Sequence, residues 1–472
     1  MSLAESPAVA DPRPLERKLA WSVSERLVSE IAAAGWPVGE VMGSETDLVE
    51  RYGVSRAVFR EAVRLLEHQG VARMRRGPGG GLVVTVPSVE SAMDAVMVYL
   101  IYVHASLEEI LEVRLVLEEH ASGLATERLT EEGIGSLRDR VERETRGEQL
   151  DPRGLHEMIA GMSGNPALEL FVDLLTRAAV VYSPHVEPSD MVVVDLILDA
   201  HARIVESIVG GDASRAAGRM RRHLIAEAEF VNSRLPLLPR FEALFASPSG
   251  EPKLAQSVAR TLFAEIVSDG WVVGRPLGSE SELMERIGVS RAVLREAIRV
   301  LEFHQIVVMR RGPGGGLFVA EPGMDATSDV VAMFLDRRGV RPDQFFEARS
   351  IIELKVLDRT IEHLDDSMID RLREAHEVES AVSPETFRTS GHDLHLVLAD
   401  LSKNKVLALF TDVTVRLSRR HSAAPADAPN PIPSDDVVKV HEAIIDAIIT
   451  RDVDLARHRM RRHLEALSHW MR

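Results

Sequence analysis

Two segments of the chain carry arginines at a spacing that suits contact with DNA. Arg56 and Arg60 lie four residues apart, just after a serine that suits a helix N-terminus, so both side chains share one helix face. An arginine placed there can donate two hydrogen bonds to O6 and N7 of guanine, while neighbouring arginines hold phosphates. The residues that we assign to DNA contact on this basis are Ser55, Arg56, Arg60, Arg75 and Arg76, and in the second segment Ser290, Arg291, Arg295, Arg310 and Arg311.

The charge balance of these segments supports the assignment. Residues 55–76 contain six Arg against two Glu, and residues 290–311 contain five against two, in a chain whose formal net charge is −17. The alternative is a solvated helix face whose arginines pair with Glu61 and Glu296. We favour DNA contact, because the whole arginine pattern occurs in both segments.

Histidines form a second set of residues that could do chemistry. Three histidines in the first half of the chain have counterparts in the second half, and each lies in a helical pattern. Three neutral imidazoles that converge from three helices could bind Zn²⁺, Ni²⁺ or a similar ion, and with an open fourth position they also suit a metal-dependent enzyme. Read alone, such histidines are just as compatible with hydrogen-bonding groups of a core. The candidate ligands are His156, His201 and His223, and His395, His441 and His463.

These residues recur because the chain is a duplicated sequence. GVSRAVFREA at 53–62 returns as GVSRAVLREA at 288–297, and aligning 43–84 with 278–319 gives 28 identities in 42 positions. RMRRHL at 219–224 returns at 459–464. The chain therefore consists of two copies of one unit of about 235 residues.

Each copy divides into a small and a large domain. The small one shows two short helices joined by a glycine-containing turn, followed by two short strands around a Gly-rich loop, which is a winged helix-turn-helix pattern. The loop lies between strands and lacks the Lys-Ser/Thr ending of a P-loop, so a nucleotide cradle is excluded. The large one has apolar residues at helical spacing throughout. The expected fold is mainly α, with two winged helix-turn-helix domains (small β-hairpin wings) alternating with two all-helical bundles: residues 15–87, 88–235, a linker at 236–251, 252–322 and 323–472.

Composition excludes several classes of protein. With 45% hydrophobic and 27% charged residues the chain can bury several cores and is not disordered. It has no cysteine, and its N-terminus lacks the pattern of a secretory signal. The longest apolar run, 95–103, is too short to cross a bilayer. We expect a cytoplasmic protein without membrane contact.

The segment GSETDLVERYGVSRAVFREAVRLLEHQGVARMRRGPGGGLVV resembles the winged helix-turn-helix of the GntR family of bacterial transcription regulators, FadR subfamily. The resemblance covers nearly the whole chain, since that subfamily joins its winged domain to a helical effector-binding FCD domain. It implies that Arg56, Arg60, Arg291 and Arg295 contact DNA and that Gly77 and Gly312 lie at the wing tips. Where the family usually has an arginine in the second helix, this chain has Thr46 and Ser281, so we expect a different operator or weaker binding.

The same resemblance implies a metal ion in one or both helical domains and a carboxylate effector; each copy could hold its own effector, or one copy could be purely structural. The family places an Asp four residues before the first histidine, but this chain has Pro152 and Gly391 there, with Asp151 and His392 as nearby substitutes. Zn or Ni is the expected ion. Arg114 and Arg349 match an arginine that often reaches the effector in the family; the alternative is a surface ion pair with the glutamate four residues later.

The duplication predicts how DNA is read. Two-fold regulators bind near-palindromic operators because two identical subunits present two recognition helices. One fused chain could supply both, acting as a pseudo-dimer on an imperfect palindrome; the alternative is a homodimer with four reading heads. We expect a regulator, with repression released by a small molecule as the favoured sense. A metal-dependent enzyme and a structural scaffold are the alternatives.

Overall fold

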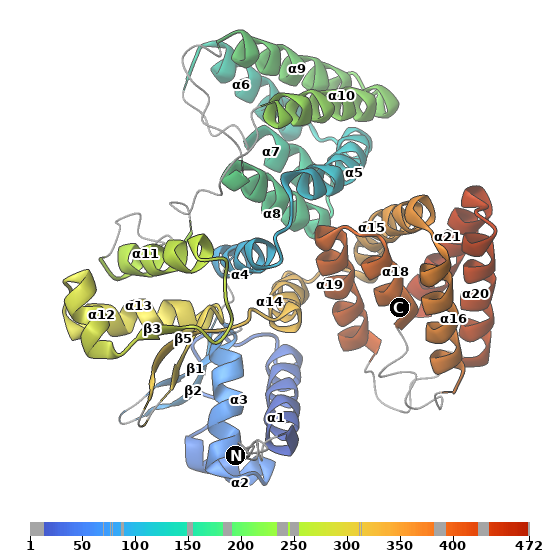
Figure 1. Cartoon of the computed structure of the whole chain (residues 1–472). Helices are drawn as coiled ribbons and strands as arrows, with labels where there is room; N and C mark the ends of the chain where they lie inside the picture. Colours follow the sequence, from blue (N-terminus) through green and yellow to red (C-terminus); the bar gives the residue numbers. More distant parts are fainter. Residues whose placement is uncertain are drawn as a thin grey trace, which may run out of the picture. The chain divides into compact units, whose positions relative to one another are not determined.

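The computed structural model describes residues 14–470, apart from 69, 76, 78, 86–88, 149–153, 183–190, 234–243, 246–253, 311, 313, 382–392 and 423–433. It divides into two compact units, Met1–Ala92 and Met93–Arg472 (Figure 1). Each unit is described by itself. The mainly helical fold with small antiparallel sheets confirms the fold class expected from the sequence. Among the described residues, no helix combines the length and the apolar character needed to cross a membrane.

The first unit holds the first winged helix-turn-helix. Its elements are α1 (Pro14–Ala33), α2 (Glu45–Tyr52), α3 (Arg56–His68), β1 (Ala72–Arg75) and β2 (Gly81–Val84). Ser44 begins α2 through a capping box with Asp47, and Gly53 ends it with a left-handed φ of 63°. The Ser55 hydroxyl then accepts a hydrogen bond from the Val58 N–H at 3.2 Å, which starts α3 one residue before Arg56.

A glycine fixes the base of the wing in this unit. β1 pairs antiparallel with β2, and Val41 adds a single bridge to Val83. Gly81 has a φ of 152°, and a Cβ built there would lie 2.3 Å from the Gly43 carbonyl oxygen. The segment before α2 therefore lies directly against the start of β2, at a distance that only glycine allows.

The second unit contains the second winged domain. Its elements are α11 (Leu254–Ser268), β3 (Pro276–Gly278), α12 (Glu280–Ile287), α13 (Arg291–Phe303), β4 (Val307–Arg310) and β5 (Gly316–Val319). The strands form an antiparallel sheet in the order β3-β5-β4. Ser279 and Ser290 cap α12 and α13, as their counterparts do in the first copy.

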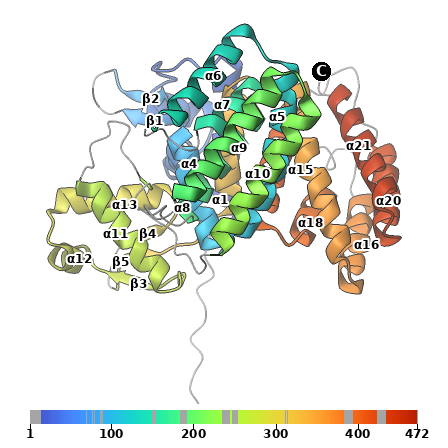
Figure 2. The same cartoon turned by 90° about the horizontal axis from the view of Figure 1, so that it is seen from above.

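Two helical domains complete the second unit. The first contains α4 (Val89–Tyr102), which begins in the first unit, α5 (Leu107–Glu127), α6 (Glu131–Thr145), α7 (Gly154–Met162), α8 (Pro166–Tyr182), α9 (Met191–Val209) and α10 (Ala213–Asn232). The second contains α14 (Met324–Arg337), α15 (Pro342–His363), α16 (Asp366–Ala381), α18 (Asp393–Leu401), α19 (Lys405–Ser422), α20 (Ser434–Ile449) and α21 (Val453–Trp470). Figure 2 shows α5, α9 and α10 running alongside one another in the first bundle.

Equivalent residues of the two repeats meet where the helical domains join. The rings of Phe171 on α8 and Phe410 on α19 stack with their centroids 4.6 Å apart, and both are fully buried. The Asn165 amide donates to the Gln344 carbonyl at 2.7 Å, and the Asn404 amide donates to the Glu109 carbonyl at 3.2 Å. A residue that contacts its own counterpart is the mark of a two-fold interface, which here lies inside one chain.

Ion pairs across the same junction do not repeat. Lys355 pairs with Glu112 at 2.7 Å, but the counterpart of this lysine is His120. On the other side Arg128 pairs with Glu347 at 2.8 Å. The apolar centre and the asparagine contacts are thus symmetric, whereas the charged rim distinguishes the two halves.

Replacing Gly81 by alanine should destabilise the first winged domain by about 1–3 kcal/mol, because the new Cβ meets the Gly43 carbonyl in a strained backbone conformation. Urea unfolding followed by tryptophan fluorescence measures the loss. Gly123→Ala is the matched control, since that helical position has open space and gains helix propensity. Equal midpoints for the two variants would refute the close approach.

Candidate functional sites

The structure places the predicted reading arginines on exposed helix faces. Arg60 and Arg295 have 65% and 58% of their side chains exposed, and Arg291 has 63%. Each pair begins at the first residue of its helix, so the arginines stand beside the free N–H groups of that helix end. Both features, a positive helix face and an N-terminus, attract phosphate and base acceptors.

The arginines have ion-pair partners that the sequence pattern did not reveal. Arg60 pairs with Glu45 at 2.8 Å, and Arg295 pairs with Glu280 at 2.6 Å. Each glutamate comes from the first turn of the preceding helix, fifteen residues earlier in the chain. Glu61, a partner that the alternative of a solvated helix face expects, pairs with Arg64 of the same arginine row at 2.8 Å. These pairs are exposed and therefore weak, so they hold the guanidinium groups in place without preventing them from exchanging partners.

The wings present fewer described contacts. Arg75 donates to the Gly79 carbonyl at 2.8 Å, and Arg310 lies over the Phe318 ring at 4.4 Å. Gly77 has a φ of 100° and Gly312 a φ of 98°, which suits the turn of each wing. Arg76 and Arg311 lie outside the described residues.

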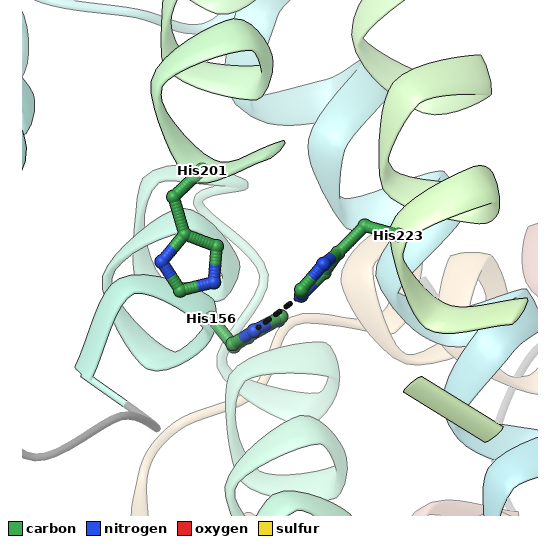
Figure 3. Close-up of side chains that lie close together, drawn as sticks. All are labelled: His156, His201 and His223. Carbon is green, nitrogen blue, oxygen red and sulfur yellow. Dashed lines mark hydrogen bonds between the residues drawn. The ribbon is translucent and has the colours of Figure 1, made fainter. Parts of the chain in front are cut away.

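The six predicted histidines form two buried clusters, one in each helical domain. His156 on α7, His201 on α9 and His223 on α10 converge in the first (Figure 3), and His395, His441 and His463 converge in the second. Within each cluster the candidate ligand atoms lie within 4.8 Å of one another. Sequence spacing alone did not require this convergence, because the histidines come from three separate helices.

Carboxylates fix which ring nitrogen of the histidines faces the centre. Glu118 accepts from His156 Nδ1, and Glu144 accepts from His201 Nδ1 at 3.0 Å. In the second cluster Glu353 accepts from His395 Nδ1 and Glu379 from His441 Nδ1, at 2.5 and 2.8 Å. An ionised carboxylate only accepts, so Nδ1 carries the proton and Nε2 keeps a lone pair. This is the arrangement that orients metal-binding histidines in many proteins.

The distances between the Nε2 atoms fit a metal ion. They are 3.4 Å for His156 and His223, 3.3 Å for His395 and His463, and 3.2 Å for His441 and His463. Two ligands at 2.0–2.1 Å from a tetrahedral ion stand about 3.3 Å apart. His201 Nε2 is buried without a hydrogen-bond partner. Without an ion the close pairs are hydrogen bonds between a protonated and an unprotonated Nε2 (Figure 3), and with every Nε2 unprotonated a cation between them stabilises the buried lone pairs, so both clusters suit a divalent ion.

Burial keeps the histidines in the form that binds metal. It lowers the pKa of His223 and His463 well below the usual histidine value, and the neighbouring histidines lower both further. Burial also lowers the pKa of His201, against the opposing effect of Glu144. For Glu353, burial raises the pKa, but Arg349 and His395 outweigh it and lower the pKa to about 2. Burial therefore favours the neutral, metal-binding form of His201, His223 and His463.

The predicted effector arginines adjoin these centres. Arg114 Nε donates to Glu118, which holds His156, and Arg349 Nε donates in the same way to Glu353. The alternative expected from the sequence is a surface ion pair between the arginine and the glutamate one helical turn later. The ion pair is present in both copies, but both of its side chains are buried. Whether either arginine touches an effector stays a prediction. Asp151, Pro152, Gly391 and His392 lie outside the described residues.

Sequence analysis missed the outer carboxylates Glu144 and Glu379. They occupy the same position in the two repeats, 235 residues apart, so comparison of the copies could have found them. Nothing in their local sequence connects them with a histidine 57 or 62 residues away.

Comparison with known proteins identifies both parts of each repeat. The family model described as "Bacterial regulatory proteins, gntR family" matches residues 19–82 and 254–319, and the FCD domain model matches 109–226 and 344–466. The chain belongs to the GntR family. It carries the family's DNA-binding domain and FCD effector-binding domain twice and is a transcriptional regulator. GntR helix-turn-helix domains bind double-stranded DNA.

Single-copy regulators align with one repeat at a time. The Exu regulon transcriptional regulator of Escherichia coli is 27% identical over 224 residues, which is 46% of this chain and 84% of that protein. The Uxu operon regulator of Haemophilus influenzae is 27% identical over 43% of this chain and 77% of its own length. A solved structure of a Streptococcus agalactiae GntR protein covers 46% of the chain and 99% of its own, at 21% identity and a TM-score of 0.35. The enzyme alternative finds no support in these matches.

Replacing Glu118 by glutamine should weaken metal binding by the first cluster about 10- to 100-fold, because a neutral amide orients and polarises His156 less strongly than a carboxylate. Competition between the protein and a zinc-sensitive dye measures the affinity of each site. Glu119→Gln, at the next residue of the same helix, is the control and should bind as the parent does. Unchanged zinc affinity in Glu118→Gln would contradict the role of this carboxylate.

Metal-free protein should lose stability as the pH falls below about 6.5. His223 and His463 have depressed pKa values when folded, so the unfolded chain takes up protons first, and stability present above pH 6.5 is lost on acidification. Each histidine contributes at most about 1.4 kcal/mol per pH unit.

Urea unfolding in EDTA between about pH 8 and pH 5 tests this dependence. The double variant His223→Leu/His463→Leu should show a flatter dependence than the parent. Identical slopes would show that the two clusters do not hold buried neutral histidines.

Proposed function

We propose that one chain reads an imperfect palindromic operator with its two winged domains, as a repressor that a small carboxylate releases. The stacking of Phe171 on Phe410 carries this proposal, because it joins the two repeats in the way that two subunits of a two-fold dimer meet. The chain then holds within itself the pair of reading heads that a palindrome requires.

The reading residues are the arginines at the start of α3 and α13. Arg56 and Arg60 serve one half-site, and Arg291 and Arg295 serve the other. Ser55 and Ser290 bring their main-chain N–H groups to DNA phosphates. The wing residues add further contacts to the DNA backbone: Arg75, Arg76, Gly77, Arg310, Arg311 and Gly312. Because the two heads differ in sequence, the two half-sites differ as well.

The helical domains supply control. A divalent ion, Zn²⁺ or Ni²⁺, is held by His156, His201 and His223 or by His395, His441 and His463, and supplies an open coordination position for an acid. Arg114 or Arg349 offers a guanidinium group beside the same centre. An acid that binds one arrangement of the helical domains more tightly favours that arrangement, and with it one spacing of the reading heads. The coupling free energy between acid binding and DNA binding is about 1–3 kcal/mol. Bound acid thereby lowers the affinity for the operator.

Replacing Arg56, Arg60, Arg291 and Arg295 together by alanine should abolish sequence-specific binding and leave only weak, salt-sensitive attraction. The experiment selects operators from a random DNA pool with the parent chain and then measures affinity by fluorescence anisotropy, against unlabelled competitor DNA. Replacing only Arg56 and Arg60 should relax the sequence preference at one half-site while the other half-site keeps its own.

Arg138→Ala, an exposed arginine on α6, is the control for loss of charge and should bind as the parent does. If the variant with all four arginines replaced still binds its operator specifically, other residues read the DNA. An operator without two related half-sites would refute the two-headed reading of a palindrome.

A further inference from the structure

The two histidine clusters differ in one charged neighbour. Glu227 lies on α10 one helical turn after His223, and its Oε1 accepts a hydrogen bond from Arg114 Nη1 at 2.6 Å. The repeated segment RMRRHL aligns Glu227 with Leu467 on α21, one turn after His463. A spacing of four residues places both members of each pair on one helix face. The first cluster thus has a nearby acid that the second lacks.

The arginine of the second cluster has a different partner. Arg349 Nη1 donates to the Ser418 hydroxyl at 2.7 Å, where the first repeat has Ala179. Arg114 and Arg349 keep the same bond from Nε to Glu118 and Glu353. The difference between the copies therefore concerns only the outer nitrogen of the guanidinium group: a carboxylate occupies it in the first copy and a neutral hydroxyl in the second.

The chemistry of guanidinium makes this difference matter. A guanidinium group binds carboxylates through strong, charge-assisted hydrogen bonds, so an external acid that approaches Nη1 of Arg114 competes with Glu227. A serine hydroxyl is uncharged and gives way at lower cost. Neither Pro152 nor Gly391 offers a carboxylate of its own, so Glu227 is an additional acid beside the first centre, with no counterpart at Leu467.

The two histidine clusters are built alike, except that His441 Nε2 contacts His463 Nε2 whereas His201 Nε2 has no hydrogen-bond partner. All six are buried, and each cluster has a pair of Nε2 atoms at a separation of 3.2–3.4 Å. His201 Nε2 faces the first centre without a hydrogen-bond partner. Both clusters have the residues to hold an ion, and the copies differ at Nη1 of the arginine, which pairs with a carboxylate in the first copy and with a serine hydroxyl in the second.

We propose that the clusters have divided labour: Glu227 is a built-in acid that closes the first metal site, and the second site alone binds an external carboxylate, between its metal ion and Arg349. This inference rests on the proposed function, because it takes a metal ion in both clusters and a carboxylate as effector. It adds that one chain senses one acid molecule, through its C-terminal half.

Cobalt(II) and two simple anions test the proposal without knowledge of the effector. The full chain is loaded with Co²⁺ in place of its metal, and acetate or azide is titrated while the visible absorption of Co²⁺ is recorded. The parent should bind two Co²⁺ per chain, and the anions should shift the bands of half of the bound Co²⁺. The double variant Glu227→Leu/Ala179→Ser, which copies the surroundings of Arg349 into the first repeat, should respond at both ions.

The reverse change closes the second site. Leu467→Glu should leave two bound Co²⁺ that no longer respond to either anion. Glu229→Leu, an exposed glutamate on the same helix as Glu227, is the matched control and should respond at half of the Co²⁺. Circular dichroism and thermal melting confirm that each variant is folded, and Glu227→Gln provides a near-isosteric second variant, whose neutral amide should also open the first site.

Three results would overturn the proposal: a response of both Co²⁺ ions in the parent, a response of half of the ions that persists in Leu467→Glu, or no stoichiometric Co²⁺ binding. Operator binding is measured on the same variants without metal or anion. If the parent protein does not bind any DNA specifically, the proposed function is rejected. The Co²⁺ spectra would still decide whether the two sites differ.

Discussion

The stacking of Phe171 on Phe410 is the contact on which the arrangement of the helical domains depends. The two phenylalanines are the same position of a repeated sequence, so the domains meet through identical surfaces turned toward each other. In a homodimer such a contact forms between two chains. Here it forms within one chain, and the asparagine contacts on either side of it repeat in the same symmetric way.

Fusion also allows the halves to diverge, which identical subunits cannot do. The charged rim uses Lys355 with Glu112 on one side and Arg128 with Glu347 on the other. These pairs are exposed or half-buried, and each adds little stability. Their effect is on specificity, because an arrangement of the domains that brought like charges together would be destabilised. Because the halves can diverge, one repeat has Glu227 at the position where the other repeat has Leu467, while the surrounding helices remain alike.

Each histidine cluster is surrounded by buried charged side chains in an otherwise aliphatic bundle. Arg349, Glu353 and His395 form a continuous hydrogen-bonded chain with almost no solvent contact. Buried ion pairs contribute little net stability compared with apolar side chains of similar size. Their presence at equivalent places in both repeats therefore points to a task at the centre, which is to hold three imidazoles with their Nε2 lone pairs directed toward one point.

The sequence predicts local structure well because local rules govern it. Ser44 and Gly53 bound α2 through capping that involves only neighbouring residues, and the spacing of Arg56 and Arg60 fixes their common face. The repeat likewise identified the histidines as a set. The contacts of Arg60 with Glu45 and of His201 with Glu144 could not be read from spacing, since they depend on how separate helices pack. The burial of Arg114 is of the same kind: the i,i+4 rule gives its partner but not its surroundings.

In the proposed function, one polypeptide supplies both reading heads of a palindromic operator. Native mass spectrometry of the protein bound to its selected operator tests this claim most directly, because it counts chains per DNA duplex. We expect one chain on a duplex that carries both half-sites, and the same count when the concentration of protein is raised severalfold. Two chains on that duplex, with no complex of a single chain at any concentration, would contradict it and would show that the chain still works as a dimer with four reading heads.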